Sequence, residues 1–285
     1  MAIFSNQATL SYAGGSTLSN VVTGEITESV TVTKTAVGGT YTPRGTVTYA
    51  VSILRCGCGC AACELTVTDD LGAYPFGTGT LTPLTYAEGS LLYYADGVLQ
   101  PTPTVTATAP LTVTGITLPA GKNALLIYSA TANEFAPLGT EGSIVNTVTV
   151  TGTCIPESIT ASATVEALAG TALSIDKALC PPSICENGEV TYTFVISNAG
   201  NTPAVATDNL SVTDTFNPIL SNITVTLDGE ILTEGTDYTY DEATGLFQTT
   251  QSRITVPAAT VTQDPETGVY TTKPGTATLT VTGNI

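Results

Sequence analysis

Seven cysteines are the residues of this sequence whose chemistry is most evident. Four lie in one stretch and three lie apart from it: Cys56, Cys58, Cys60 and Cys63, then Cys154, Cys180 and Cys185. The clustered spacing, Cys-x-Cys-x-Cys-x-x-Cys, offers thiolates to zinc or to an iron–sulfur cluster but matches no standard site for either. We therefore expect disulfides and no bound metal, with Cys180 and Cys185 as a candidate local pair. Because seven is odd, at least one thiol is expected to be free or bonded between molecules.

Composition argues against several classes of function. The chain has 24 acidic and 7 basic residues, a formal net charge of −17, so nucleic acid and anionic membranes are poor partners. It has no histidine, which removes the commonest general base and the Ser–His and Cys–His nucleophile pairs. We expect no cofactor and no enzymatic turnover of a substrate.

The elements that position these residues are predicted to be β-strands. Valine and threonine alternate with a period of two in many short runs, separated by turns rich in glycine and proline. The clearest runs are Val30–Lys34, Val47–Ile53, Leu65–Thr68, Val105–Ala109 and Ile144–Thr151. The pattern predicts an all-β chain made of antiparallel sandwiches.

The second half of the sequence repeats the first. Four segments recur in the same order: Glu28–Lys34 as Thr171–Lys177, Thr46–Tyr49 as Glu189–Tyr192, Leu65–Asp69 as Leu210–Asp214, and Gly121–Tyr128 as Gly275–Thr282. The repeat predicts two tandem Ig-like β-sandwich domains, over residues 27–168 and 169–285.

The two copies break off at different points. The first continues into a closing strand at Ile144–Thr151, whereas the second stops before any such strand. A near copy of the closing strand stands at Ile3–Tyr12, where Asn6 matches Asn146. We therefore expect the second domain to lack its last strand, and residues 1–26 to hold a donor strand and a linker.

An incomplete sandwich leaves unpaired backbone groups and an open apolar groove. A strand donated by a neighbouring molecule satisfies both, with Phe4, Asn6, Ala8 and Leu10 as the donor-strand residues. Such a contact between copies is head-to-tail, so it propagates into a filament unless it closes a ring. The alternatives are that residues 1–15 fold back onto the second domain of their own chain, or are disordered.

These motifs resemble the DUF11 repeat of bacterial surface proteins, an Ig-like domain. The resemblance covers nearly the whole chain and rests on Lys34, Gly45–Tyr49, Val67–Asp69, Pro119–Gly121 and Ile144–Val150 in the first copy, and on Lys177, Gly188–Tyr192, Asn198–Gly200 and Val212–Phe216 in the second. The first copy departs from the pattern where Cys56–Cys63 replaces an Asn-x-Gly turn. The resemblance implies a surface or matrix protein without enzymatic turnover.

The order lysine, aspartate, asparagine also resembles the triad of isopeptide-forming pilin and adhesin domains. In that triad a buried, neutral lysine attacks an asparagine carboxamide, ammonia leaves, and a protonated acid polarises the amide. An apolar core favours both uncharged forms. The resemblance implies a Lys34–Asn146 bond promoted by Asp69, with Asp70 as a substitute acid.

The second copy has Lys177 and Asp214 but no matching asparagine, and Asn6 of the donor strand stands in its place. The resemblance thus implies an intermolecular Lys177–Asn6 bond promoted by Asp214. A competing interpretation treats the lysines as edge charges and the asparagines as caps of a bulge. We expect Lys34 to lie on the threonine face of its strand, which favours the competing interpretation.

These observations predict a structural subunit of a bacterial extracellular filament, on a cell or spore surface, that polymerises with itself through donor strands and is cross-linked by isopeptide bonds or disulfides. The alternative is a monomeric surface adhesin that binds a host or matrix ligand through loops such as Leu91–Val98. No signal peptide is visible, because no basic segment precedes a long apolar one, so the export route stays open. No apolar run is long enough for a membrane span.

Overall fold

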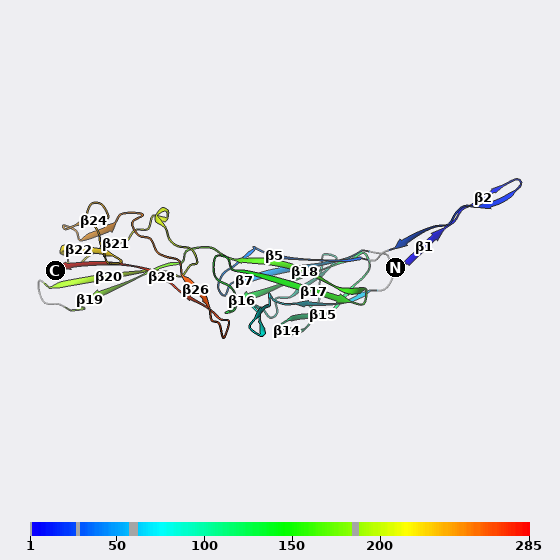
Figure 1. The fold of residues 1–285 in the computed structure, drawn as a ribbon, viewed down its shortest axis with the longest axis horizontal. Coiled ribbons are helices and arrows are strands. Elements are labelled where there is room, and N and C mark those ends of the chain that lie inside the picture. The colour runs from blue at the N-terminus through cyan, green and yellow to red at the C-terminus, as the bar shows by residue number, and fades with distance from the viewer. Residues whose placement is uncertain (1, 27–28, 57–61, 184–187) are drawn as a thin grey trace. The chain divides into compact units, whose positions relative to one another are not determined.

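The computed structural model describes residues 2–26, 29–56, 62–183 and 188–285. It divides into two compact units, one formed by Met1–Pro137 with Gly142–Glu166 and the other by Leu138–Glu141 with Ala167–Ile285. Strands dominate both units (Figure 1). The central strand pairs of both units are antiparallel. The all-β prediction is confirmed.

Unit one is a sandwich of two six-stranded sheets. The first sheet runs β13 (Val98–Gln100), β12 (Leu92–Ala95), β16 (Asn123–Ala132), β7 (Thr46–Cys56), β5 (Ser29–Val37), with β11 (Leu84–Tyr86) also on β16. The second runs β14 (Thr104–Thr108), β15 (Leu111–Leu118), β8 (Cys63–Asp69), β17 (Ser143–Gly152), β18 (Ile155–Ala167), β6 (Thr40–Tyr41). A separate hairpin joins β9 (Tyr74–Phe76) to β10 (Gly79–Leu81).

The strands form where the sequence alternates, because a period of two sends one set of side chains inward and the other toward solvent. On β7 the inward set is Val47, Tyr49, Val51 and Ile53, all 1% exposed or less. The five runs chosen from the sequence fall on β5, β7, β8, β14 and β17, and only the last residue of the β14 run lies outside its strand.

A closing hairpin, β17–β18, completes unit one. Strand β17 pairs with β8 on one side and with β18 on the other. The turn of the hairpin is tied back to the start of β8 by a disulfide between Cys63 and Cys154, whose Cα atoms are 5.4 Å apart. The bond closes a loop of sequence separation 91, which restricts the unfolded chain strongly.

The N-terminal segment is a hairpin rather than a strand with a linker. Strand β1 (Ala2–Asn6) pairs with β4 (Val22–Ile26), and β2 (Thr9–Tyr12) pairs with β3 (Gly15–Leu18). The residues expected to form a linker thus supply the second strand of a ribbon. Every side chain from residue 3 to 23 is exposed, including the apolar Ile3, Phe4 and Leu10.

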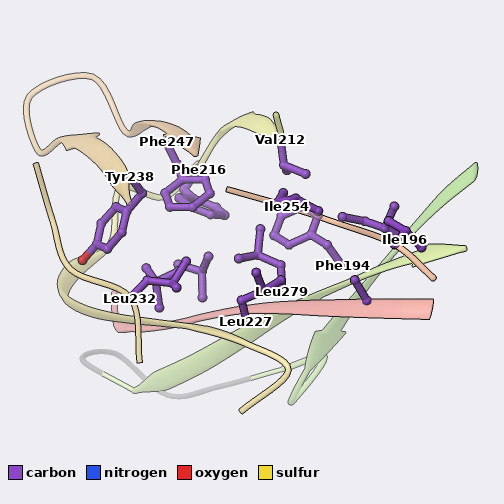
Figure 2. Packing of buried hydrophobic residues seen from close by; sticks show 14 of the residues in the cluster. Phe194, Ile196, Val212, Phe216, Leu227, Leu232, Tyr238, Phe247, Ile254 and Leu279 are labelled. Carbon is purple, nitrogen blue, oxygen red and sulfur yellow. The ribbon is translucent and has the colours of Figure 1, made fainter. Parts of the chain in front are cut away.

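Unit two repeats the scaffold of unit one in part. Its main sheet runs β19 (Leu173–Cys180), β20 (Glu189–Asn198), β28 (Gly275–Asn284), β22 (Ser221–Leu227), β23 (Glu230–Ile231). A second sheet runs β21 (Thr213–Thr215), β25 (Leu246–Thr249), β24 (Tyr238–Asp241), and β26 (Thr260–Gln263) pairs with β27 (Tyr270–Lys273). A 3-10 helix covers Ala206–Asp208. Figure 2 shows the apolar core of this unit, in which Phe194, Phe216, Phe247 and Leu279 are buried.

Unit two has no counterpart of the closing hairpin among the described residues. In unit one β8 has strands on both sides, whereas β21 pairs only with β25. All eight residues of β19 are exposed. An open groove lies beside these strands, lined by Leu173, Ser174, Ile175, Ile196, Leu210, Ser211, Val212 and Ile254.

Candidate cross-linking sites

Lys34 points into the core of unit one. Strand β5 turns Val30, Val32, Lys34 and Ala36 inward, whereas the threonines between them are exposed. The expectation that Lys34 lies on the threonine face was wrong, since residues 30, 32 and 34 are two apart and share one side of a strand. The lysine side chain is 0% exposed, although β5 is an edge strand.

Asp69, at the end of β8 in the opposite sheet, is the partner of this lysine. The Lys34 Nζ to Asp69 Oδ2 distance is 2.5 Å, and the aspartate side chain is 2% exposed. Tyr128 of β16 donates a hydrogen bond to the same Oδ2 at 2.5 Å. The other oxygen, Oδ1, accepts from the backbone N–H of Leu71. The lysine amine, the tyrosine hydroxyl and the Leu71 N–H therefore all bond to one carboxylate, which is buried away from water.

Asp70, the substitute acid, bonds to backbone N–H groups and not to the lysine. Its Oδ1 accepts the backbone N–H groups of Gly72 and Thr147, both at 2.8 Å. It therefore fixes the turn after β8 and the neighbouring strand β17. Of the two aspartates, Asp69 is the one bonded to the lysine.

Asn146 completes the cluster from β17. It is 0% exposed, and its Nδ2 donates to the Tyr128 hydroxyl at 3.4 Å. Its carbonyl oxygen, Oδ1, accepts no hydrogen bond within the described residues. A buried carboxamide oxygen without a donor costs free energy, so this oxygen is an unusual feature of the core.

The polar chain in unit one therefore runs from Lys34 through Asp69 and Tyr128 to Asn146. The three residues suggested by the sequence for this site come together. The four residues of this hydrogen-bonded series lie on four different strands, so no local sequence motif could predict the complete series.

Burial shifts the pKa values of two residues in this cluster, Lys34 and Tyr128. It lowers the pKa of Lys34, and this effect outweighs the opposing attraction of the Asp69 charge. Burial raises the pKa of Tyr128 well above its usual value, and Asp69 raises it further. The ring of Tyr49 lies 4.8 Å from the lysine nitrogen.

The Tyr49 hydroxyl is a second polar group without a hydrogen bond of good geometry in the described residues. Burial raises its pKa, and the nearby Asn146 amide offsets part of that rise. The Tyr49 hydroxyl and the Asn146 amide are neighbours and are not hydrogen-bonded to each other. The site therefore brings together a lysine whose pKa is lowered, a carboxyl group and a carboxamide, all of them buried.

Sequence reasoning missed the role of Tyr128. The tyrosine lies directly opposite Tyr49 in the β7–β16 ladder, and the two rings stack with centroids 5.7 Å apart. In unit two Val281 stands opposite Tyr192, so the tyrosine has no counterpart there. The sequence match of Gly121–Tyr128 with Gly275–Thr282 is therefore shifted by one residue at this position, and in either alignment no tyrosine stands in place of Tyr128.

The second lysine–aspartate pair forms in unit two without an asparagine. Lys177 of β19 bonds to Asp214 of β21, and their side chains are 40% and 20% exposed. Aromatic rings surround the amine, with the Tyr192 centroid at 4.6 Å and that of Phe216 at 5.5 Å. Asn6 lies on β1 of the N-terminal hairpin and is exposed.

The cysteines divide into three groups. Cys63 and Cys154 form the disulfide, a pairing that the sequence did not specify. Cys56 and Cys180 are exposed thiols in the described parts of the chain. Cys58, Cys60 and Cys185 lie outside the described residues, so the predicted Cys180–Cys185 pair stays a prediction. Within the described ranges no cluster of three or more histidine, cysteine or acidic side chains could hold a metal ion.

Over the part of the chain that the structure describes, no helix is both long enough and apolar enough to cross a membrane. Comparison with protein families and with curated proteins gives no match. The resemblance to the DUF11 repeat therefore stays a prediction.

Solved structures similar to this chain are bacterial pilins and surface proteins. The major pilin subunit BcpA of Bacillus cereus is 13% identical, and the match covers 96% of this chain and 73% of that one, with a TM-score of 0.37. The pilus backbone protein RrgB of Streptococcus pneumoniae is 14% identical over 86% of this chain and 56% of its own, with a TM-score of 0.30. The collagen binding subdomain ACE19 of the Enterococcus faecalis surface protein ACE is 8% identical over 47% of this chain and 94% of that one, with a TM-score of 0.29. At TM-scores this low the likeness to pilin and adhesin domains is distant, and it carries no argument about function.

Proposed function

We propose that this protein is the structural subunit of a bacterial extracellular filament, on a cell or spore surface. Subunits polymerise head to tail, because the N-terminal hairpin of one copy completes the second unit of the next. The observation that carries the proposal is the likeness between the N-terminal hairpin and the closing hairpin of unit one. One such hairpin is packed against a sandwich, and the other is exposed from residue 3 to residue 23.

The inward side chains of the two hairpins correspond. On β17, Ile144, Asn146, Val148 and Val150 point into unit one and are 2% exposed or less. Their counterparts by sequence are Phe4, Asn6, Ala8 and Leu10, three apolar residues and the same asparagine. Of these, Phe4 is 54% and Leu10 66% exposed. Apolar side chains on an isolated two-stranded ribbon gain from a partner surface.

The groove of unit two offers that surface. It is lined mainly by aliphatic side chains, and β21 has a free edge in the described part of the unit. An added strand pairs with the backbone of such an edge and places alternate side chains in the groove. Burying one large apolar side chain fully contributes about 1.5–3 kcal/mol, so Phe4 and Leu10 together favour docking clearly.

Within unit one we propose a second structural device, an isopeptide bond between Lys34 and Asn146. The neutral lysine Nζ attacks the asparagine Cγ, a new C–N bond forms, and the Cγ–Nδ2 bond breaks as ammonia leaves. Asp69 accepts the proton that the amine loses and returns it to the departing nitrogen. The buried contacts of Lys34 and Asn146 with Asp69 and Tyr128 support this step. It occurs once per molecule and turns over no substrate.

The assembly test is imaging of the purified full chain over a range of concentrations, beside a variant that lacks residues 1–26. We expect filaments from the full chain only. The matched control carries Ile231→Ser, which changes an exposed apolar residue of unit two, 76% accessible, away from the groove lining. Filaments from the truncated chain would contradict the proposal.

The alternative is a monomeric adhesin that binds a host or matrix ligand. The observation in its favour is the β12–β13 hairpin, which exposes Val98 and Leu99 by 62% and 57%. Size-exclusion chromatography at high concentration separates the two functions, since an adhesin elutes as a monomer.

A further inference from the structure

We infer that docking of the N-terminal hairpin assembles a second cross-linking site, and that an isopeptide bond from Asn6 to Lys177 then joins the two copies. The inference rests on the proposed head-to-tail assembly and deepens it. It specifies which residues pair at the joint between two copies, which bond forms there, and that the bond forms after docking.

The register follows from the closing hairpin of unit one. There β17 pairs with β8 so that Val148 lies opposite Asp69, and Val150 lies opposite Val67. Asp214 and Val212 of unit two correspond to those two β8 residues. The matching donor residues are Ala8 and Leu10. The joint therefore places Ala8 opposite Asp214 and Leu10 opposite Val212.

This register brings Asn6 to the lysine. In unit one, Asn146 lies two residues before the partner of Asp69 and on the same inward face. Asn6 lies two residues before Ala8 and shares its face in the same way. Lys177 already bonds to Asp214, as Lys34 does to Asp69. Docking supplies the missing carboxamide to a pair that is already formed.

The lysine–aspartate pair is buried in unit one and partly exposed in unit two. The lysine and aspartate side chains are 0% and 2% exposed in unit one, where β17 covers them. In unit two they are 40% and 20% exposed, and no strand covers them among the described residues. A charged lysine in water is a poor nucleophile, and a docked strand removes that water. The bond thus follows docking and does not precede it.

The step balances without any other reactant. The neutral Nζ of Lys177 attacks Cγ of Asn6, and the Cγ–Nδ2 bond breaks. Asp214 takes the proton lost by the amine and delivers it to the leaving nitrogen, which departs as ammonia. Each joint loses the mass of one ammonia, and no oxidant or reductant takes part.

The test compares filaments of the full chain with those of Asn6→Ala and Lys177→Arg after boiling in SDS with reductant. We expect covalent multimers from the unchanged chain and monomers from both variants. The arginine variant keeps a cation beside Asp214, so its filaments are expected to assemble and be visible by imaging before SDS. The control Lys34→Arg removes the proposed bond inside unit one and is expected to keep the multimers.

A digest of the multimers should yield a peptide pair linked between Asn6 and Lys177, lighter by one ammonia than the two peptides together. Filaments of the unchanged chain that dissolve to monomers would overturn the inference and leave the proposed assembly intact. Multimers that persist in Asn6→Ala would overturn it as well. If no variant and no unchanged protein forms filaments, the proposed function itself fails.

The register has an independent test that does not depend on the bond. Thr151 lies opposite Thr66 in unit one, so Ser11 is expected opposite Ser211 at the joint. Opposed strand residues are within reach of a disulfide. Mixing Ser11→Cys with Ser211→Cys molecules, both carrying Lys177→Arg, should give an 11–211 disulfide on mild oxidation. Ser5→Cys, on β1 and out of register, should not pair with position 211. Equal linking of both positions would refute the register.

Discussion

Lys34 and Asp69 lie on opposite sheets of unit one and meet at 2.5 Å with almost no access to water. A buried ion pair is weak support for stability by itself, because both groups lose their hydration. Tyr128 and Asn146 extend the pair to a carboxamide, and this arrangement is the basis of the proposed Lys34–Asn146 bond. Its chemistry and its contribution to folding can be tested separately.

Replacing Asp69 with alanine should abolish the Lys34–Asn146 bond, because no other group bonded to the lysine can carry its proton. The intact mass of unit one is expected to rise by one ammonia, after correction for the substitution. Asp70→Ala is the matched control and should keep the bond, since Asp70 holds backbone N–H groups. Equal masses in Asp69→Ala and the unchanged protein, after the same correction, would show that no bond forms or that Asp69 is dispensable.

Replacing Tyr128 with phenylalanine should slow bond formation without preventing folding. The hydroxyl links Asp69 to Asn146, whereas the ring packs on Tyr49 and remains in the variant. A hydrogen bond to a charged group contributes about 1.5–3 kcal/mol to stability, less than the roughly 5–15 kcal/mol of a typical domain, so the fold should survive. The measurement is the cross-linked fraction against time after refolding. Tyr86→Phe, on a ring that also packs on Tyr128, is the control and should react at the unchanged rate.

The pH dependence of unit one should reveal the buried lysine once the bond is prevented. In Asn146→Ala, Lys34 stays an amine whose pKa lies below the usual 10.5 because of burial. The unfolded chain then binds more protons than the folded one between the two pKa values, so stability rises with pH in that window. Urea unfolding of Asn146→Ala and Asn146→Ala/Lys34→Met at several pH values isolates this slope. The free energy of unfolding of Asn146→Ala minus that of the double variant should rise with pH. A fall in this difference as pH rises would contradict the lowered pKa of Lys34.

Much of this architecture was predictable from the sequence, and the failures have identifiable causes. Alternation predicts the strands because it reports directly which residues face the core. Tyr128 was missed because its role depends on the strand register opposite Tyr49, which no local pattern encodes. The Cys63–Cys154 pairing could not be chosen among seven cysteines, since spacing does not determine which sulfurs meet. The second strand of the N-terminal hairpin was taken for a linker, although it pairs with β1 as β18 pairs with β17.

Breaking the disulfide should weaken unit one more than any loss of an exposed thiol. Cys63→Ser frees a loop of sequence separation 91, and the chain-entropy estimate for a loop of that size is about 4.6 kcal/mol. The expected result is a clear drop in the urea midpoint of Cys63→Ser under non-reducing conditions, equal to that of the unchanged protein with reductant. Cys56→Ser, which removes an exposed thiol on β7, should leave the midpoint unchanged. If both substitutions lower the midpoint equally, or neither does, the disulfide between the closing hairpin and β8 adds little to the stability of unit one, and the expectation is contradicted.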